Sequence, residues 1–252
     1  MESPFTYSKP ITGQWFIGRE AESRTLSNLL TQGENILISE PPKSGKGSLI
    51  RQTFLSLKSR GCQFIPVFVE LMSIRSKEDF ILRLGSETLK AVFSTPQDYS
   101  NAIASLLPNT HFIFDSEAFS RSGETLSLNW DMDSHDISAI ISLPYRIGAT
   151  TGKKIFVTLS EFQNIALTDG QYEICQAFET LFGTLDASEH TYASYIISGS
   201  RVNAMEQILR GPSRLGRFTE RIQFGEIDTR IIIDHVIKGF NSSGKVIDRE
   251  LL

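Results

Sequence analysis

The 252-residue sequence has few of the features that are typical of secreted, membrane-spanning or nucleic-acid-binding proteins. Its two cysteines, Cys62 and Cys175, stand in unrelated segments and indicate reduced, buried thiols rather than a disulfide framework. Its four histidines show no metal-ligand spacing. No apolar run is long enough to span a membrane, and residues 1–10 lack the apolar core of a signal peptide. The net charge of −4 gives no bulk attraction to nucleic acid. We therefore expect a cytoplasmic protein without a membrane partner and with no strong nucleic-acid signal.

Continuous apolar runs alternate with segments of helical periodicity along the chain. The runs at 64–71 and 155–159 are typical of strands that are buried on both faces. Strands are predicted at 36–38, 64–71, 155–162, 192–199 and 222–224, and helices at 16–30, 47–60, 76–94, 136–147, 172–182 and 229–240. Alternating strands and helices predict an α/β fold, with a parallel sheet covered by helices on both faces.

One stretch departs from this alternation. Residues 111–114 and 125–130 alternate like two strands, and SRSGE at 120–124 between them supplies a turn. We predict an inserted β-hairpin at about 108–132. Two roles stay open for it: a partner-binding insertion or a structural flap.

The most informative segment, residues 36–54, reads ILISEPPKSGKGSLIRQTF. A buried strand, a tight loop and a helix with Gly45 and Lys46 at the junction predict a P-loop, in which backbone N–H groups and the helix N-terminus hold a phosphate. Lys46 would reach the β- and γ-phosphates. The alternative is an ordinary helix cap that contains Gly-Lys. We expect ATP or ADP to contact Pro42, Lys43, Ser44, Gly45, Lys46, Gly47, Ser48 and Leu49.

Two departures from the strict pattern G-x-x-x-x-G-K-[ST] weaken this P-loop. Glu40 stands where the first glycine should be, and Gly47 stands where the serine or threonine should be. The missing hydroxyl normally coordinates Mg²⁺. Ser48 is one residue further on, but one helical step turns a side chain by about 100°. Ser48 is therefore only a weak metal candidate.

Further polar residues follow two other predicted strands. Glu161 ends one of them and Ser200 ends another. In open parallel sheets the ligand binds at the carboxyl ends of the strands. Lys46, Glu161 and Ser200 are thus expected to converge on one edge of the sheet.

Five pieces in this order and spacing resemble a known family: FIGREAE, ILISEPPKSGKGSL, IFVTLSEFQNIA, YIISGSR and RLGRFTERIQF. Across residues 15–227 the chain resembles the AAA+-type P-loop ATPases of the archaeal and bacterial "ATPase domain" group, close to the STAND NTPases. The resemblance implies a three-layer αβα sandwich with a mainly parallel five-stranded sheet. It also implies a nucleotide-binding domain at 1–227 and the start of a helical or winged lid domain at 228–252, with a last helix from 246 that is cut short.

The resemblance also implies roles for single residues. Ser160 replaces the aspartate that normally holds Mg²⁺, which makes Ser160 a second weak metal candidate, while Glu161 keeps the carboxylate that orients the attacking water. Ser200 or Ser198 would contact the γ-phosphate. Structural alternatives stay open for these positions: a solvated carboxylate for Glu161 and a helix cap for Ser200.

The remaining implied roles concern the arginines and the base. Arg217 or Arg221 would act as an arginine finger, in cis or toward a neighbouring chain, with a surface ion pair as the alternative. Gly18 and Arg19 would lie near the adenine.

Three functions follow from this pattern. Because both supports for the metal are lost while the phosphate loop remains, the first is an ATP-binding switch or regulatory module with weak or lost hydrolysis. The second is a pseudo-ATPase scaffold that binds no nucleotide, which Glu40 favours because an acid repels a phosphate. The third is a fully active ATPase in which water fills the Mg²⁺ positions. A protein partner and a homo-oligomer are also expected, but the sequence specifies neither.

Overall fold

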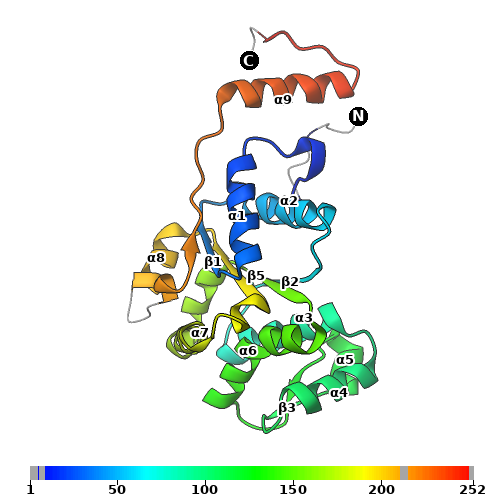
Figure 1. The fold of residues 1–252 in the computed structure, drawn as a ribbon, viewed down its shortest axis with the longest axis vertical. Helices are drawn as coiled ribbons and strands as arrows, with labels where there is room; N and C mark the ends of the chain where they lie inside the picture. The colour runs from blue at the N-terminus through cyan, green and yellow to red at the C-terminus, as the bar shows by residue number, and fades with distance from the viewer. Residues whose placement is uncertain (1–4, 6–8, 211–214, 250–252) are drawn as a thin grey trace.

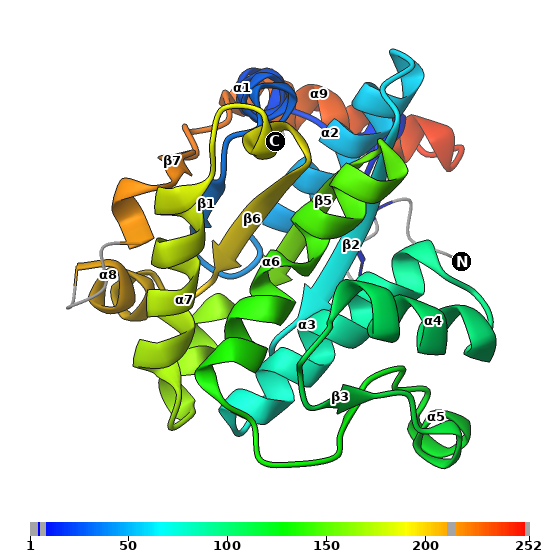
Figure 2. The ribbon, with the colours of Figure 1, turned by 60° about the horizontal axis from the view of Figure 1, so that its bottom comes forward.

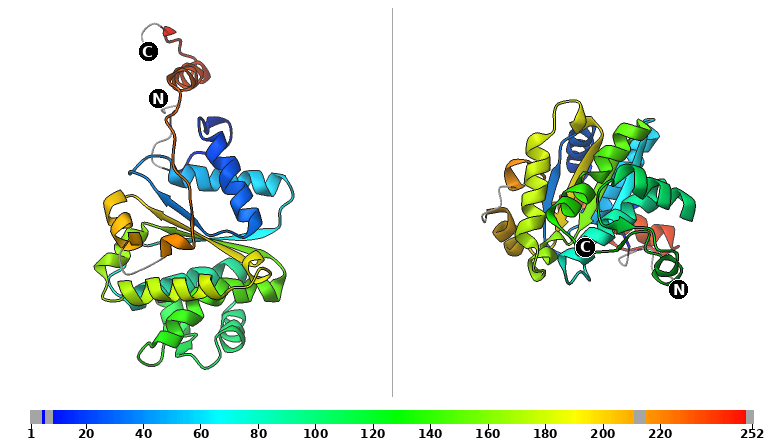
Figure 3. Two further views of the ribbon diagram at one scale, coloured as in Figure 1. Left: turned by 60° about the vertical axis from the view of Figure 1, so that its left-hand side comes forward. Right: turned by 90° about the horizontal axis from the view of Figure 1, so that it is seen from below.

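A central sheet of five parallel strands, in the order β2-β5-β6-β1-β7, organises the structure, a computed structural model that describes residues 5, 9–210 and 215–249. Helices lie on both faces of the sheet (Figures 1 and 3). The sheet strands are β1 Ile36–Ser39, β2 Phe64–Glu70, β5 Lys154–Ser160, β6 Ala193–Gly199 and β7 Glu220–Arg221. The predicted α/β P-loop architecture with its five-stranded sheet is therefore confirmed.

Two helices, α1 Glu20–Gln32 and α2 Lys46–Ser59, cover one face of the sheet. Their apolar stripes bury Leu26, Leu30 and Leu49 against the sheet. Phe54 of α2 also packs on the ring of Phe156 in β5, with 5.8 Å between ring centroids. This face carries the phosphate loop, because α2 follows β1 directly.

The opposite face holds the larger core, under the helices α3 Lys77–Val92, α6 Ser134–Thr151 and α7 Gln171–Thr184 (Figure 2). Capping boxes start α3 at Ser76 and α6 at Asp133. Tyr195 of β6 is fully buried here, and its hydroxyl donates to the carbonyl of Ile141 at 2.7 Å. This layer holds the strands in place and contributes no side chain to the phosphate loop.

The predicted hairpin is only partly right. β3 Phe112–Ile113 and β4 Ser127–Leu128 do pair in an antiparallel sense, but helix α5 Ser116–Ser122 fills the connection that was predicted to be a turn. Asp115 caps this helix, and its Phe119 packs on Tyr99 with 5.6 Å between ring centroids. Tyr99 belongs to α4 Pro96–Leu106, which was not predicted.

The C-terminal part contains a second set of corrections. Strand β7 lies two residues before the predicted 222–224, although the amide of Ile222 still donates to Leu37 at 3.0 Å. Helix α9 Thr229–Ser242 confirms the predicted helix and stands apart from the sheet (Figure 1). Residues 246–248 are not helical as predicted, and residues 250–252 lie outside the described part.

The remaining elements are short. They are α8 Val202–Arg210 and the 3₁₀ turns η1 Gly13–Trp15, η2 Phe162–Leu167, η3 Glu189–Thr191 and η4 Leu215–Arg217. Across the described ranges, none of the helices combines the length and apolarity needed to cross a bilayer.

Candidate functional site

The connection from β1 to α2 has the geometry of a phosphate loop. Lys43 has φ of 62° and Gly45 has φ of 96°, so two left-handed residues curl the chain between strand and helix. Glycine adopts this angle without strain, which explains Gly45. As the N-cap of α2, Gly45 offers no side chain to the first N–H groups of the helix. These groups suit an external anion.

The ammonium group of Lys46 turns back onto its own loop. Its Nζ donates to the carbonyls of Glu40 and Pro41, at 2.7 and 2.9 Å. Burial lowers the pKa of Lys46, while the nearby carboxylates of Glu161 and Glu40 act in the opposite direction. Lys46 therefore bridges the loop and faces the acidic end of β5, as predicted from the sequence.

Glu40 does not point an unpaired carboxylate at the loop. Its Oε1 accepts a hydrogen bond from the backbone N–H of Phe224 at 2.9 Å, so the acid ties the loop to the segment after β7. This contact weakens the argument that Glu40 repels a phosphate.

Glu161 is the centre of a hydrogen-bonded triad. It has a left-handed conformation, with φ of 59°, directly after β5. Its Oε2 accepts from Ser200 Oγ at 2.5 Å and from Gln163 Nε2 at 2.6 Å. The Oε1 of Gln163 in turn accepts from the backbone N–H of Ser200 at 3.3 Å. The predicted meeting of Glu161 and Ser200 thus occurs, and Gln163 joins them.

The two serine candidates at the end of β6, Ser198 and Ser200, form different hydrogen bonds. The hydroxyl of Ser198 donates to the carbonyl of Leu159 at 3.1 Å, so it serves the sheet. Ser200 instead contacts Glu161. Of the two, Ser200 is the one that lies with the acidic group.

A cavity of about 230 Å³ lies at the carboxyl ends of β2, β5 and β6, below Lys46. We call it the strand-end cavity. Ser160 and Glu161 line it, together with Glu70 of β2, which was not predicted. Glu70 as a whole is exposed, but partial desolvation of its carboxyl and the charge of Glu161 raise its pKa above the ordinary value. The only sequence signal for Glu70 was its place at the end of an apolar strand.

The segment before η1 lies over the first turn of α2. The backbone N–H of Ile11 donates to Ser48 Oγ at 2.9 Å, and a Cβ on Gly47 would lie 3.4 Å from the Pro10 ring. Pro10, Gly47 and Lys46 line a second cavity of about 540 Å³, the loop cavity. Because the hydroxyl of Ser48 is engaged by Ile11, the structure gives no support to Ser48 as a metal ligand.

The other predicted loop residues divide into two groups. Pro42 and Lys43 are exposed and line the loop cavity, and Ser44 has a buried hydroxyl without a partner among the described residues. Leu49 was also predicted to contact the nucleotide, and its placement gives that prediction no support. Its side chain is fully buried in the core, and its N–H donates to the carbonyl of Gly45 at 2.9 Å.

The predicted arginine finger does not reach this site. β7 pairs Glu220 with Ile36, the first residue of β1, so the preceding Arg217 lies toward the amino ends of the strands. Lys46 follows the carboxyl end of β1. Arg221 lies on the same strand as Glu220, and its guanidinium is 3.9 Å from the Glu206 carboxylate. This topology gives no support to an arginine finger in cis, and the arginine finger, in cis or toward a neighbouring chain, stays a prediction.

Gly18 and Arg19 hold the segment that leads to α9. Arg19 donates to the carbonyl of Gly225 at 2.5 Å, and its guanidinium lies 4.3 Å from the centre of the Phe224 ring. A Cβ on Gly18 would lie 2.4 Å from the Ile227 side chain. These contacts tie the two residues to protein, so their predicted contact with adenine receives no direct support.

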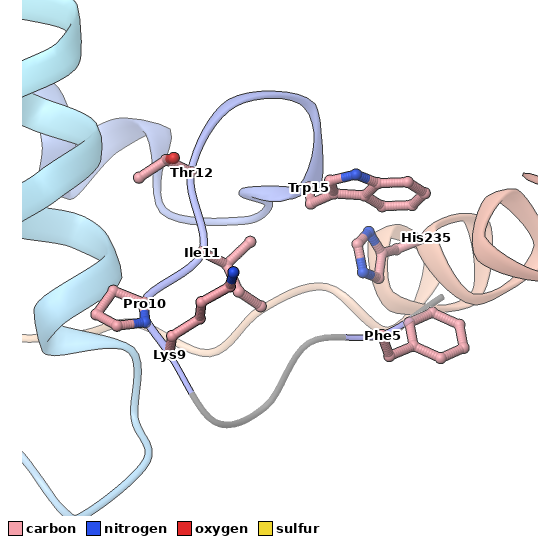
Figure 4. Close-up of a pocket in the computed structure, with 7 residues that line it drawn as sticks. All are labelled: Phe5, Lys9, Pro10, Ile11, Thr12, Trp15 and His235. Atoms are coloured by element: carbon pink, nitrogen blue, oxygen red, sulfur yellow. The ribbon is translucent and has the colours of Figure 1, made fainter. Parts of the chain in front are cut away.

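A third hollow lies between the N-terminal segment and α9 (Figure 4). This aromatic pocket has a volume of about 240 Å³ and was missed by the sequence analysis. The ring of His235 lies between Trp15 and Phe5, with centroid distances of 5.7 and 5.9 Å. Burial and Lys238 lower the pKa of His235, and its Nδ1 has no partner among the described residues. Pro10 lines all three hollows and so connects the pocket to the phosphate loop.

The fold matches solved ATPase structures. A Walker-type ATPase of Pyrococcus abyssi superposes with a TM-score of 0.61 at 19% identity, covering 96% of this chain and 63% of that one. The ORC2 protein of Aeropyrum pernix, solved as ADPNP-ADP complexes, gives 0.58 at 10% identity, covering 92% and 54%. No family model and no curated protein matches the sequence. The chain thus has the fold of these ATPases, and it spans less than two thirds of the length of each.

Proposed function

We propose that the chain is an ATP-binding P-loop domain with weak or lost hydrolysis, which acts as a nucleotide-responsive switch. The observation that carries this proposal is the first turn of α2. Its N–H groups receive no side-chain cap from Gly45, and the ammonium of Lys46 rests on loop carbonyls beside them. A helix N-terminus and a cation together favour a phosphate.

The phosphates would displace the internal contacts of Lys46. Its Nζ would move from the carbonyls of Glu40 and Pro41 to the phosphate oxygens, which are stronger, charged acceptors. Glu40 stays bound to Phe224, so a change at the loop would be passed to the segment leading to α9. This chain of contacts is a physical route by which a nucleotide would alter α9.

The base would occupy the aromatic pocket. Aromatic rings offer flat faces for a purine, and the unpartnered Nδ1 of His235 offers a hydrogen bond. Adenine nucleotides are favoured because the Aeropyrum pernix protein of similar fold was solved with ADPNP and ADP. Ile11 and Pro10 lie between the pocket and the loop and would contact the sugar.

Weak hydrolysis follows from what surrounds the phosphate position. Ser160 is neutral, Gly47 has no hydroxyl, and Ser48 is engaged by Ile11, so the predicted metal ligands do not fit Mg²⁺. Glu161 would still accept a hydrogen bond from water, but its Oε2 already accepts hydrogen bonds from Ser200 and Gln163. Neither Arg217 nor Arg221 is at the carboxyl edge of the sheet. A metal bound with the phosphates would supply charge stabilisation.

Thermal unfolding with ATP, ADP or GTP, each with Mg²⁺ or EDTA, tests the proposal. A ligand at ~100 times its Kd adds about 2.7 kcal/mol of stability, or about 5–11 °C for a domain of this size. We expect such a shift for ATP in the wild type and its loss in Lys46→Ala. Lys153→Ala is the matched control, because Lys153 is an exposed lysine that precedes β5, at the opposite end of the strands from the loop.

Two results would contradict the proposal. The absence of a shift with any nucleotide would favour the scaffold function. ATP turnover at rates of about 1 per second or more would favour an active ATPase instead.

A further inference from the structure

A row of polar residues crosses the strands at the floor of the strand-end cavity. The register pairs Glu70 of β2 with Ser160 of β5, and the neighbouring ladder places Ser198 of β6 next in the same row. Residues two apart on a strand share a face, so Thr158 lies one step below Ser160 on the same face. All four line the strand-end cavity. Glu70 therefore stands one strand away from the place where the family resemblance expects a carboxylate.

The cavity contains a polar atom without a partner. Thr158 is only 2% exposed, and its Oγ1 makes no hydrogen bond within the described part of the chain. A buried hydroxyl without a partner is costly, and in a cavity it points to a ligand or to ordered water. Thr158 faces the same space as the carboxylates of Glu70 and Glu161.

The two carboxylates share the cavity with Lys46, whose Nζ donates to the carbonyls of Glu40 and Pro41 rather than to either carboxylate. Neither Glu70 nor Glu161 forms an ion pair with the described residues. Arg83 is close to Glu70 but donates to its backbone carbonyl and to Ser73. Arg51, which also lines the cavity, has its guanidinium 4.4 Å from the centre of the Phe68 ring. Two carboxylates facing one small cavity favour a cation between them.

We infer that Glu70 and Glu161 hold a divalent cation in the strand-end cavity, with the hydroxyl of Thr158 toward it. This inference rests on the proposed function, since the phosphates would complete the oxygen ligands. Mg²⁺ and Mn²⁺ prefer oxygen and are commonly held by one or two carboxylates plus substrate phosphates. Adjacent strands are about 4.8 Å apart, and glutamate reaches further than aspartate by one methylene. Glu70 thus supplies from β2 the charge that Ser160 lacks on β5.

The site is tested by titrating the full chain with Mn²⁺. Binding is measured by electron paramagnetic resonance, as the decrease in the signal of free Mn²⁺, and so does not depend on catalysis. We expect wild type to bind Mn²⁺, more tightly when ATP is present. Glu70→Gln should weaken this binding by about tenfold or more, because removing a ligand costs at least as much as disturbing an outer contact. Thr158→Val, which keeps the shape but loses the hydroxyl, should weaken it by a smaller factor. Glu34→Gln is the control, since Glu34 is exposed in the turn before β1, at the opposite end of the strands.

A second arm separates the two proposals. ATP affinity is measured in EDTA and in Mg²⁺, for wild type and Glu70→Gln. The inference is supported if Mg²⁺ raises the ATP affinity of wild type but does not raise that of Glu70→Gln. Equal affinity under all these conditions keeps the nucleotide site and overturns the cation site. If ATP does not bind at all, the proposed function fails, and Mn²⁺ binding alone then decides for or against the cavity.

Discussion

The chain carries two clusters of acidic side chains that differ in whether their oxygen atoms are already used. In the first, His111, Asp133 and Asp136 bring potential metal-binding atoms within 4.8 Å of one another. The amides of His111 and Asp133 and the ring of His111 all bond to the Asp136 carboxylate, at 2.8–3.0 Å. Asp133 in turn accepts from the amide of Asp136. In the second, Glu70 and Glu161 face a cavity with an unpartnered hydroxyl.

The comparison separates the closeness of potential ligand atoms from their availability for a ligand. The His111 cluster is the tighter of the two, but its oxygens cap the start of α6 and tie β3 to it. The strand-end cluster leaves the hydroxyl of Thr158 without a partner among the described residues, although Glu161 already accepts hydrogen bonds from Ser200 and Gln163. A ligand site is better recognised by polar atoms that the fold leaves unsatisfied.

The largest expected effect comes from adding charge to the strand-end cluster. Ser160→Asp combined with Gly47→Ser restores both lost supports for Mg²⁺, and we expect ATP hydrolysis to rise by about 10²-fold or more, the size of a preorganised electrostatic contact. Phosphate release under single turnover is the measurement. A Ser at Gly47 fits, because its Cβ would meet Pro10 at 3.4 Å. No gain in a variant that still binds ATP would contradict weak hydrolysis through metal loss.

We call His111, Asp133 and Asp136 the capping cluster. Removing charge from this cluster should reduce the stability of the fold. Asp136 is fully buried and accepts hydrogen bonds from His111 and Asp133. Asp136→Asn should destabilise the fold by about 3 kcal/mol, since hydrogen bonds to a buried charge are strong. The melting temperature should fall by roughly 6–12 °C, without loss of Mn²⁺ binding. Asp115→Asn, which alters the exposed cap of α5, should have a smaller effect. Loss of Mn²⁺ binding in folded Asp136→Asn would reverse the assignment of the two clusters.

A third change tests the triad around Glu161. Ser200→Ala removes the hydroxyl that bonds to Glu161 at 2.5 Å, which should lower ATP affinity or stability by about 1–2 kcal/mol. In the background of Glu161→Gln the same change should cost less, because the charged acceptor is gone. Ser198→Ala provides the control, as its hydroxyl serves the sheet. Equal costs in both backgrounds would show that Ser200 acts independently of Glu161.

The pH response of the capping cluster gives a smaller effect. The hydrogen bond to Asp136 raises the pKa of His111 above 6.5, so protonation stabilises the fold. This contribution is complete below pH 6.5 and is lost as pH rises through the raised pKa. The pKa of Asp136 is lowered, so its own contribution declines only as pH falls below 3.8. The melting-temperature gap between wild type and His111→Gln should narrow from about pH 6 to about pH 8.5. A constant gap would contradict the pairing.

The sequence revealed the parts of the site that local pattern encodes. The strand before Glu40 and the turn at Gly45 are short-range features, so this strand, loop and helix were predicted correctly. Glu70 was missed because its role depends on the register with Ser160, which joins residues far apart in the chain. The apolar run before Glu70 indicated only a buried strand.

The aromatic pocket and the corrected elements were missed for related reasons. His235 and Trp15 meet only because α9 returns to the N-terminal segment. Helix α5 was taken for a turn because its apolar contact, Phe119 on Tyr99, comes from a helix that was itself not predicted. Leu49 was assigned to the ligand although its place in α2 turns it into the core.

The smallest effect is expected at Arg217, which sharpens the contrast between the two ends of the sheet. Arg217 precedes β7 and lies toward the amino ends of the strands, so Arg217→Ala should leave ATP affinity of the monomer within about twofold, as expected for a surface change. Arg51→Ala, which alters the arginine of the strand-end cavity, should change it more. If Arg217→Ala lowers hydrolysis only at concentrations at which the chain self-associates, Arg217 acts on a neighbouring copy. A loss of ATP affinity in the monomer would contradict the placement of Arg217 away from the site.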